Sequence, residues 1–438
     1  MLFKNISIID ENQKWQKHMY VGVIDDKIDY VSSEEPSSEK IAKYGEIYDG
    51  TNKVLMPGFY NAHSHSAMVM LRSREDKLPL QEWLQTNCFP FEAKMTKEDN
   101  YWGTTLGCAE MLRYGVVSCS DMYYHSNLRI KATNDAKAKI NICQHLDDFS
   151  ENGVIFEDHP FGQYTKDLVA NHHNSQNGRI KVDACVHSEY ITTEKLFRSV
   201  SDFAIDNDLI LHFHVSETER ENNECKERHN GMSPTQYFES IGVLRGKTNL
   251  AHCVWLDEAD EEILKNYDAT LVTCPASNMK LGSGFADVPG WFEKGINVAL
   301  GTDGASSNNK YNFFMDMYLM SIIFKGHTGD PCAISAEQVF YAATRGGALA
   351  QGRKDCGFIK EGFKADLCVM DLSEPIWSPE TNMVNNLIYS GQGSDIILTM
   401  VDGEILYKNG EWLTIDIEKA KSEVSARRLR IDNELLNS

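Results

Sequence analysis

Short apolar runs alternate with longer helical stretches along most of this chain, and that alternation restricts the fold more than any other feature. From residue 54 onward each β-rich run ends in polar residues, and amphipathic stretches such as 101–113 and 257–267 follow a helical period. We count eight such runs: 55–65, 116–123, 140–146, 180–187, 209–216, 250–254, 270–274 and 298–302. Eight strand–helix units predict a (β/α)8 TIM barrel of parallel strands, with its active site at their C-terminal ends.

The two chain ends have a different pattern, in which short alternating segments are separated by turns. Because chain termini commonly meet and isolated hairpins are unstable, we expect the ends to form one small β-sandwich domain. The predicted boundaries are 1–56 and 357–415 for this domain, 57–356 for the catalytic barrel and 416–438 for a C-terminal helix. The predicted fold class is therefore α/β.

The composition argues against several classes of function. The chain carries 43 Lys and Arg against 64 Asp and Glu, a net charge of −21, whereas nucleic-acid binding needs clustered positive charge. The longest apolar stretch, 317–324, is far shorter than the ~20 residues of a membrane span. Asp10 and Glu11 interrupt the N-terminus before an apolar signal region forms, and the 11 cysteines include no C-x-x-C pair. We expect a cytoplasmic protein with reduced thiols, a small-molecule substrate and no nucleic-acid or membrane partner.

Histidines stand at the end of the first barrel run, where NAHSH places His63 and His65 two residues apart. Side chains two apart on a strand point to the same side, so both imidazoles can reach one ion. Alone this H-x-H pair is a weak signal, because two hydrogen-bonded barrel histidines give the same pattern.

Other strand ends strengthen the signal. The fifth run supplies His212, His214 and then Glu217, the sixth ends with His252, and the eighth is followed by Asp303. Imidazole and carboxylate groups at four strand ends are costly to bury unless they are paired or metal-bound. Three imidazoles and one carboxylate suit a divalent first-row metal, which would activate a water molecule as the nucleophile.

With these motifs in place, the chain resembles the amidohydrolase superfamily, and within it the branch of methylthioadenosine/S-adenosylhomocysteine deaminases and related chlorohydrolase-like aminohydrolases. The matching segments are PGFYNAHSHSAM at 57–68, LPLQEWL at 78–84, FPFEAK at 89–94, HVSETE at 214–219, AHCVWLDE at 251–258, CPASNMKLGSG at 274–284 and LGTDGASSNN at 300–309. The similarity runs over nearly the whole chain and includes GFKADL and VDG in the closing β segment.

The resemblance implies a single metal ion and a set of catalytic residues. The implied ligands are His63, His65, His214 and Asp303. Glu217 would deliver protons to the attacked ring nitrogen, His252 would orient the water or help to deprotonate it, and Asp303 would accept its proton. No lysine stands in 185–188, where binuclear members carry a bridging carboxylated lysine, so one metal is expected. Zinc follows family habit, but Fe(II) and Mn share these ligands.

His212 is outside this set, because the family ligand is the histidine three residues before the glutamate; we expect a hydrogen-bonded core histidine there. For the substrate, the resemblance assigns Trp83 to the pocket wall, Glu92 to ribose hydroxyls and His187 to a purine ring. Core packing for Trp83 and His187 and a surface position for Glu92 are the alternatives.

The implied reaction is hydrolytic deamination of an aminated heterocycle with release of ammonia. Adenosine-type nucleosides are expected: methylthioadenosine, 5′-deoxyadenosine, adenosine or S-adenosylhomocysteine. In the family, arginines between the third and fourth strands hold the homocysteine tail, but no Arg occurs between Arg129 and Arg179 here. S-adenosylhomocysteine is therefore disfavoured, unless a neighbouring subunit of a homo-oligomer supplies an arginine.

Three alternatives remain open from the sequence. The same scaffold would serve a deaminase of guanine, a pterin or a pyrimidine, or a chlorohydrolase acting on an aminated ring. A non-catalytic binding protein would have lost some ligands, whereas every expected metal and proton-transfer position is filled.

Overall fold

A computed structural model describes residues 1–74 and 77–437 of the chain. In this described part, parallel strands form a closed barrel: β6 (Phe59–His65), β7 (Val116–Tyr123), β8 (Lys139–Gln144), β9 (Ile180–Val182), β10 (Ala184–Cys185), β11 (Ile210–Val215), β12 (Lys247–His252), β13 (Ala269–Thr273), β14 (Asn297–Leu300) and β15 (Asp303–Gly304). Asp183 alone separates β9 from β10, and two residues separate β14 from β15, which pairs with β6. The strand order is that of a TIM barrel, so the predicted fold class is confirmed.

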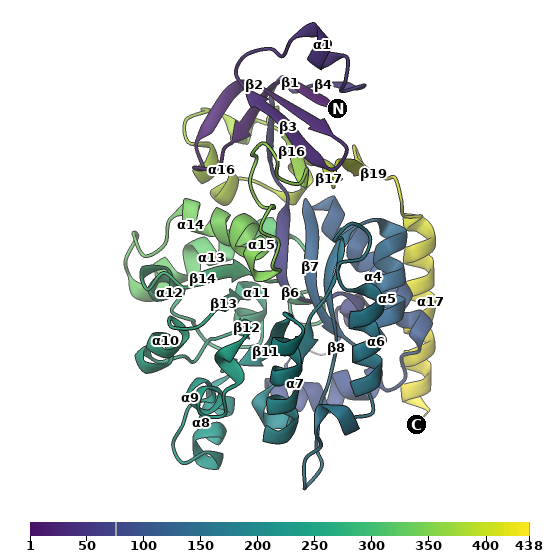
Figure 1. Ribbon diagram of the computed structural model, residues 1–438, viewed down its shortest axis with the longest axis vertical. Helices are drawn as coiled ribbons and strands as arrows, with labels where there is room; N and C mark the ends of the chain where they lie inside the picture. The colour runs from purple at the N-terminus through teal and green to yellow at the C-terminus, as the bar shows by residue number, and fades with distance from the viewer. Residues whose placement is uncertain (75–76, 438) are drawn as a thin grey trace.

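Helices cover the outside of the barrel (Figure 1). The helix α1 (Ser38–Ile41) lies away from the barrel, beside the N-terminal strands. The other helices are α2 (Leu80–Trp83), α3 (Phe89–Glu92), α4 (Lys97–Arg113), α5 (Ser126–Ala136), α6 (Gly162–His172), α7 (Glu194–Asp206), α8 (Glu219–Arg228), α9 (Pro234–Ser240), α10 (Glu258–Leu264), α11 (Pro275–Lys280), α12 (Val288–Glu293), α13 (Phe313–Thr328), α14 (Ala336–Tyr341), α15 (Gly347–Ala350), α16 (Met383–Tyr389) and α17 (Ile417–Leu436). A short 3-10 helix, η1 (Ser66–Leu71), follows β6 directly. Among the described residues, no helix combines the length and apolarity needed to cross a membrane.

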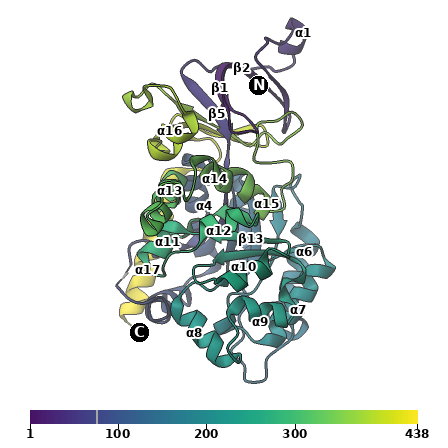
Figure 2. The same ribbon diagram turned by 90° about the vertical axis from the view of Figure 1, so that its left-hand side faces the viewer.

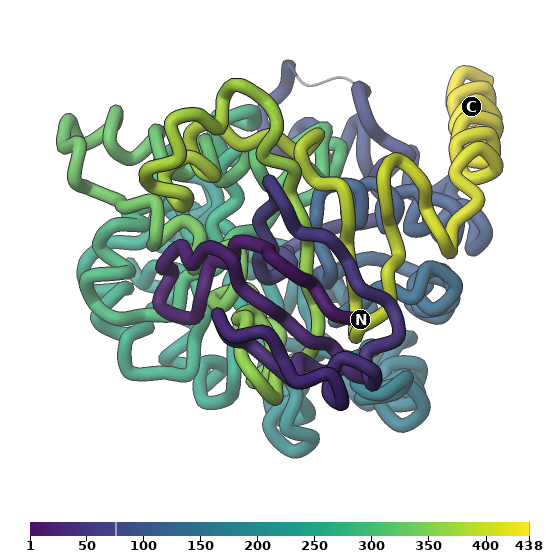
Figure 3. Tube along the Cα trace, turned by 90° about the horizontal axis from the view of Figure 1, so that it is seen from above, coloured from purple at the N-terminus to yellow at the C-terminus, as the bar shows by residue number. Residues whose placement is uncertain are grey.

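The two chain ends meet in one small domain, as predicted. Figure 3 shows the N-terminal segment and the segment before the C-terminal helix side by side. Their strands join in one mixed sheet in the order β19-β18-β17-β16-β5-β1-β2-β3, with β4 also paired to β1. The strands are β1 (Leu2–Ile9), β2 (Trp15–Ile24), β3 (Lys27–Ser32), β4 (Ile47–Asp49), β5 (Lys53–Pro57), β16 (Leu367–Asp371), β17 (Ile396–Val401), β18 (Glu404–Lys408) and β19 (Glu411–Trp412). This order supports the domain boundaries that we propose: 1–56 with 357–415 for the small domain, 57–356 for the barrel and 416–438 for the C-terminal helix.

The small domain is fastened to the N-terminal end of the barrel. Lys139, the first residue of β8, is buried and pairs with Asp366 and, at 2.6 Å, with Asp402. Arg179, just before β9, donates to the other oxygen of Asp402 at 2.9 Å. Figure 2 shows the sheet above the barrel. The C-terminal ends of the strands therefore lie on the opposite side, where this architecture places active sites.

Candidate metal and active site

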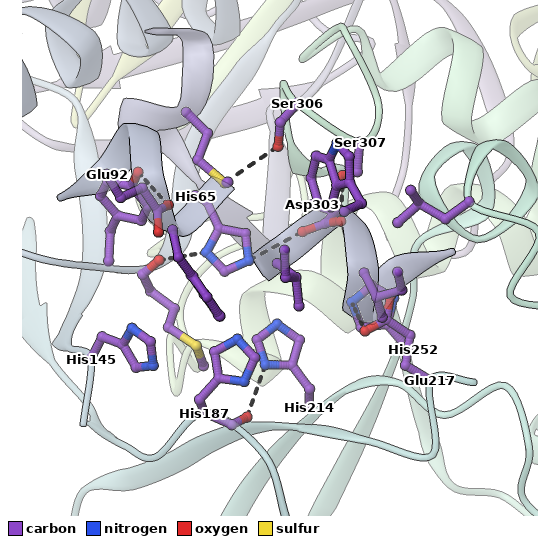
Figure 4. Close-up of a pocket in the computed structure, with 18 of the residues that line it drawn as sticks. His65, Glu92, His145, His187, His214, Glu217, His252, Asp303, Ser306 and Ser307 are labelled. Atoms are coloured by element: carbon purple, nitrogen blue, oxygen red, sulfur yellow. Dashed lines mark hydrogen bonds and ion pairs between the residues drawn. The ribbon is translucent and has the colours of Figure 1, made fainter. Parts of the chain in front are cut away.

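The predicted ligands come together where the strands end. His63 and His65 close β6, His214 lies in β11, and Asp303 opens β15. Ligand atoms of His63, His65 and His214 lie within 4.8 Å of one another, as do those of His63, His252 and Asp303. Figure 4 shows the His65 and Asp303 side chains facing each other, with His214 nearby. We call His63, His65, His214 and Asp303 the four ligand residues.

The three imidazoles are oriented through their Nδ1 atoms. His63 Nδ1 lies 2.9 Å from His212 Nε2, and His65 Nδ1 lies 2.5 Å from the carbonyl oxygen of Met122. His214 Nδ1 lies 2.9 Å from the carbonyl oxygen of His187. Such contacts fix the ring of a metal-binding histidine and leave Nε2 for the ion. His63 Nε2 is buried without a hydrogen-bond partner, which fits a divalent metal at this position.

Asp303 completes this donor set. Its Oδ1 lies 3.1 Å from His65 Nε2 and 3.5 Å from His63 Nε2. Its Oδ2 accepts hydrogen bonds from the hydroxyls of Ser277, at 2.6 Å, and Ser307. The backbone of Asp303 has φ +60°, a left-handed conformation that is costly for a non-glycine residue and concentrates at functional sites. One carboxylate oxygen is therefore held by serines while the other faces the imidazoles.

Glu217 and His252 lie on the same side of the site. Glu217 follows β11, and the carboxylate of Glu221 accepts the backbone N–H groups of Ser216 and Glu217 at 2.9 and 2.8 Å, which fixes this turn. Burial raises the pKa of Glu217 to about 8, and the charge of Asp303 adds to the shift, so Glu217 carries a proton near neutral pH. His252 Nε2 lies 3.8 Å from a Glu217 oxygen.

The residues predicted to contact substrate line one pocket together with this site. Trp83, Glu92 and His187 face it alongside His65, His214, Glu217, His252 and Asp303, while His63 lies buried beneath. Glu92 Oε1 accepts a hydrogen bond of 2.6 Å from the Tyr123 hydroxyl, and burial raises the pKa of Glu92 to about 7. The surface alternative for Glu92 is wrong, because its carboxyl group is inside the pocket.

Several residues of the site were not singled out from the sequence. Ser277 and Ser307 hold Asp303, and the Asn278 side-chain oxygen lies 2.8 Å from His252 Nδ1. All three lie inside the CPASN and GASSN motifs, and these motifs are the sequence signal that could have identified them. His145 lines the pocket at the end of β8, and its signal was a polar residue at a strand end.

A second group of ligand-type side chains lies elsewhere, formed by Glu189, Cys225 and His229. Arg228 donates to both oxygens of Glu189, and His229 Nε2 lies 2.8 Å from one of them. Because the Glu189 carboxylate is already paired with the Arg228 guanidinium, we interpret this group as an ion-pair cluster in which Glu189 is buried and Arg228 is partly exposed.

Comparison with known proteins agrees with this geometry. A sequence model described as the amidohydrolase family matches residues 54–406. The chain belongs to this family. Among similar proteins, the 5-methylthioadenosine/S-adenosylhomocysteine deaminase of Acetivibrio thermocellus is 37% identical over 98% of this chain and 100% of its own. The 5′-deoxyadenosine deaminase of Methanothermobacter thermautotrophicus is 36% identical over 83% and 84%.

A solved structure of an adenosine deaminase from Xanthomonas campestris with bound zinc is also similar. It superposes with a TM-score of 0.91 at 26% identity and covers 99% of this chain and 98% of its own. Together with the donor set described above, family membership makes this amidohydrolase a metal-dependent enzyme with a divalent ion.

The C-terminal helix of this amidohydrolase supports the pocket wall. Arg428 on α17 donates to the carbonyl oxygens of Met70, at 2.9 Å, and Arg72, at 3.2 Å, at the end of η1. Met68 in η1 lines the pocket, and its sulfur accepts from the Ser306 hydroxyl at 3.5 Å. Arg428 therefore helps to fix the chain between His65 and the pocket wall.

Replacing Arg428 with alanine should raise KM about three- to tenfold with a smaller change in kcat, because hydrogen bonds of ~0.5–1.5 kcal/mol that hold η1 are lost. Steady-state kinetics and thermal unfolding would be measured together. Lys421→Ala, an exposed change on the same helix, is the matched control. A lower Tm with an unchanged KM would mean that Arg428 stabilises the fold without shaping the pocket.

Proposed function

We propose that this amidohydrolase is a zinc-dependent hydrolytic deaminase of an adenosine-type nucleoside, with the four ligand residues holding the ion. The observation that carries the proposal is the position of Glu217, a buried carboxyl group that faces the same pocket as Asp303 and lies 3.8 Å from His252. That arrangement supplies a proton donor and a proton acceptor on one side of a bound ring. The names of the deaminase relatives support the same reaction.

When bound, the metal supplies the Lewis acidity that makes water a nucleophile near neutral pH. Asp303 accepts a proton from the attacking water, and His252 orients that water. Glu217 gives its proton to the ring nitrogen beside the amino-bearing carbon. A carbon–oxygen bond forms, and Asp303 passes the proton taken from water to the amino group, so that the carbon–nitrogen bond breaks and ammonia leaves. The ring nitrogen keeps the proton from Glu217, and the new hydroxyl group returns a proton to Glu217 as the carbonyl forms.

The shape of the pocket supports a nucleoside over a free base. The catalytic pocket has a free volume of about 60 Å³, whereas an adjoining cavity of about 660 Å³ shares Phe89, Glu92, Tyr123 and Tyr124 with it. A ring bound at Glu217 therefore has room for an attached sugar on the side of Glu92.

The basic residues near the third and fourth strands support a substrate without an amino-acid tail. Arg129 is fully buried and paired with Asp121 at 2.5 Å, so it is not free to bind a carboxylate. Lys131, Lys137, Lys139 and Lys166 all pair with acidic residues of the chain itself. Among the described residues lining the larger cavity, Lys97 and His125 are the basic ones.

Release of ammonia, and of chloride from the chlorinated ring, tests the proposal on a panel of substrates. The panel holds adenosine, 5′-deoxyadenosine, methylthioadenosine, S-adenosylhomocysteine, guanine, cytosine, a pterin and a chlorinated aminotriazine, with metal content quantified first. We expect turnover of the tail-less nucleosides and poor turnover of S-adenosylhomocysteine. Turnover of only a free base or of the chlorinated ring would replace the proposed function with one of the alternatives.

Glu92 should give nucleoside binding a pH dependence. Its pKa of about 7, raised by burial, means that the carboxyl group is protonated below neutrality and ionised above it. An ionised carboxylate accepts ribose hydroxyls better than the protonated form, so kcat/KM should rise from pH 6 through pH 7. It should fall again above about pH 8, where Glu217 loses the proton that it donates. The kcat/KM profile of Glu92→Gln should be lower and should lose this rise. An equal rise in that variant would assign the titration to another group.

A further inference from the structure

His145 is a buried polar side chain of the catalytic pocket for which the mechanism above has no use. It follows β8 directly, lines the pocket and is 6% exposed. Its Nε2 atom is buried and makes no hydrogen bond to any described residue. Because an unpaired buried nitrogen costs free energy, such atoms at an active site point to a partner outside the chain.

The imidazole of His145 is held in place by its neighbours. Its ring centroid lies 4.8 Å from that of Tyr124 and 4.9 Å from that of His187, and its backbone N–H donates to the carbonyl oxygen of Tyr123 at 3.1 Å. Burial lowers the pKa of His145 to about 3, with the charges of His65 and Arg129 adding to the shift. The ring therefore stays neutral and offers one donor and one acceptor instead of a charge.

His145 lies away from the groups that would move protons. Figure 4 shows Glu92 and His145 on one side of the pocket and Glu217 and His252 on the other. The reacting edge of a substrate ring must face Glu217 and Asp303, so His145 and Glu92 face the portion remote from the reacting carbon. In a nucleoside, that portion is the sugar.

We propose that neutral His145 hydrogen-bonds the sugar of the substrate and, together with Glu92, makes the enzyme select nucleosides over free bases. This inference rests on the proposed function and deepens it. His145 is thus a specificity-determining residue, and its contribution comes from a hydrogen bond without charge. A neutral ring offers a carboxylate-bearing substituent no ion pair.

The test compares two ligand types in two variants. His145→Ala should lower kcat/KM for 5′-deoxyadenosine about 10- to 100-fold, mostly through KM, and change that for adenine less than about threefold. His145→Gln keeps a neutral donor and acceptor and should recover part of the loss. Binding gives a second readout of the preference for nucleoside over base. The Kd values of adenosine and adenine would be measured by calorimetry in a Glu217→Gln background, where turnover does not interfere.

His159→Ala is the matched control, since this histidine lies on the same segment, lines neither cavity, and contacts the carbonyl oxygen of Asp147 through its Nε2. Equal losses for nucleoside and base, or no loss in His145→Ala, would overturn the role of His145. Failure of the proposed function is visible separately, because the unaltered enzyme would then release no ammonia from nucleosides in the first place.

Discussion

Replacing Glu217 with glutamine should lower kcat for ammonia release by ~10²–10⁴-fold while the protein keeps its metal. Glutamine matches the size of the buried side chain and retains hydrogen bonding, but it has no proton to give to the ring nitrogen. Glu217 is not among the residues that hold His63, His65 or His214, so metal content should be unchanged. Turnover and bound metal would be measured on the same preparation.

The chain offers a matched control for this change. Glu219→Gln alters an exposed carboxylate two residues away, at the start of α8, and should leave kcat within about twofold. Preserved turnover in Glu217→Gln would remove Glu217 from the mechanism. A loss of turnover together with a loss of metal would show instead that Glu217 supports the metal site.

Strand periodicity and strand order explain how much of the site follows from sequence. His63 and His65 share a face because side chains alternate along a strand, and a parallel barrel brings every strand end to one rim. Those two facts place His214, His252 and Asp303 in one neighbourhood without any coordinates. The fold class follows from the same reasoning, whereas the meeting of the chain ends was predicted from the instability of isolated hairpins.

The supporting contacts could not be predicted in this way, because they depend on loop conformation. The Ser307 hydroxyl reaches Asp303 through a turn that places the aspartate at φ +60°, and strand periodicity does not extend into such a turn. The hydrogen-bond partner of His63 could not be predicted for a related reason. His212 was expected in the core, which is where it lies, but its contact with His63 Nδ1 joins β11 to β6 across the barrel and requires three-dimensional packing. The role of His145 likewise emerges only from its unpaired nitrogen.

Replacing Asp303 with asparagine should lower kcat by at least ~10³-fold and weaken metal binding, because one change removes both a ligand charge and the proton acceptor. Treating the unaltered enzyme with a chelator should lower its Tm, since an ion that binds only the folded state stabilises that state by mass action. The same treatment should shift the Tm of Asp303→Asn much less. Metal content, Tm with and without chelator, and ammonia release would be measured for both proteins.

Ser307→Ala separates the two roles of Asp303. It removes one hydroxyl that donates to Oδ2 and leaves the carboxylate in place, so metal binding should weaken only about 10- to 100-fold, the range for partners that orient a ligand. Metal affinity should therefore decrease stepwise from the unaltered enzyme through Ser307→Ala to Asp303→Asn. Such a decrease is expected if one oxygen of the Asp303 carboxylate binds the ion while the serines hold the other. If Asp303→Asn kept full metal content and lost only turnover, Asp303 would act only as a proton acceptor, and the three imidazoles alone would bind the ion.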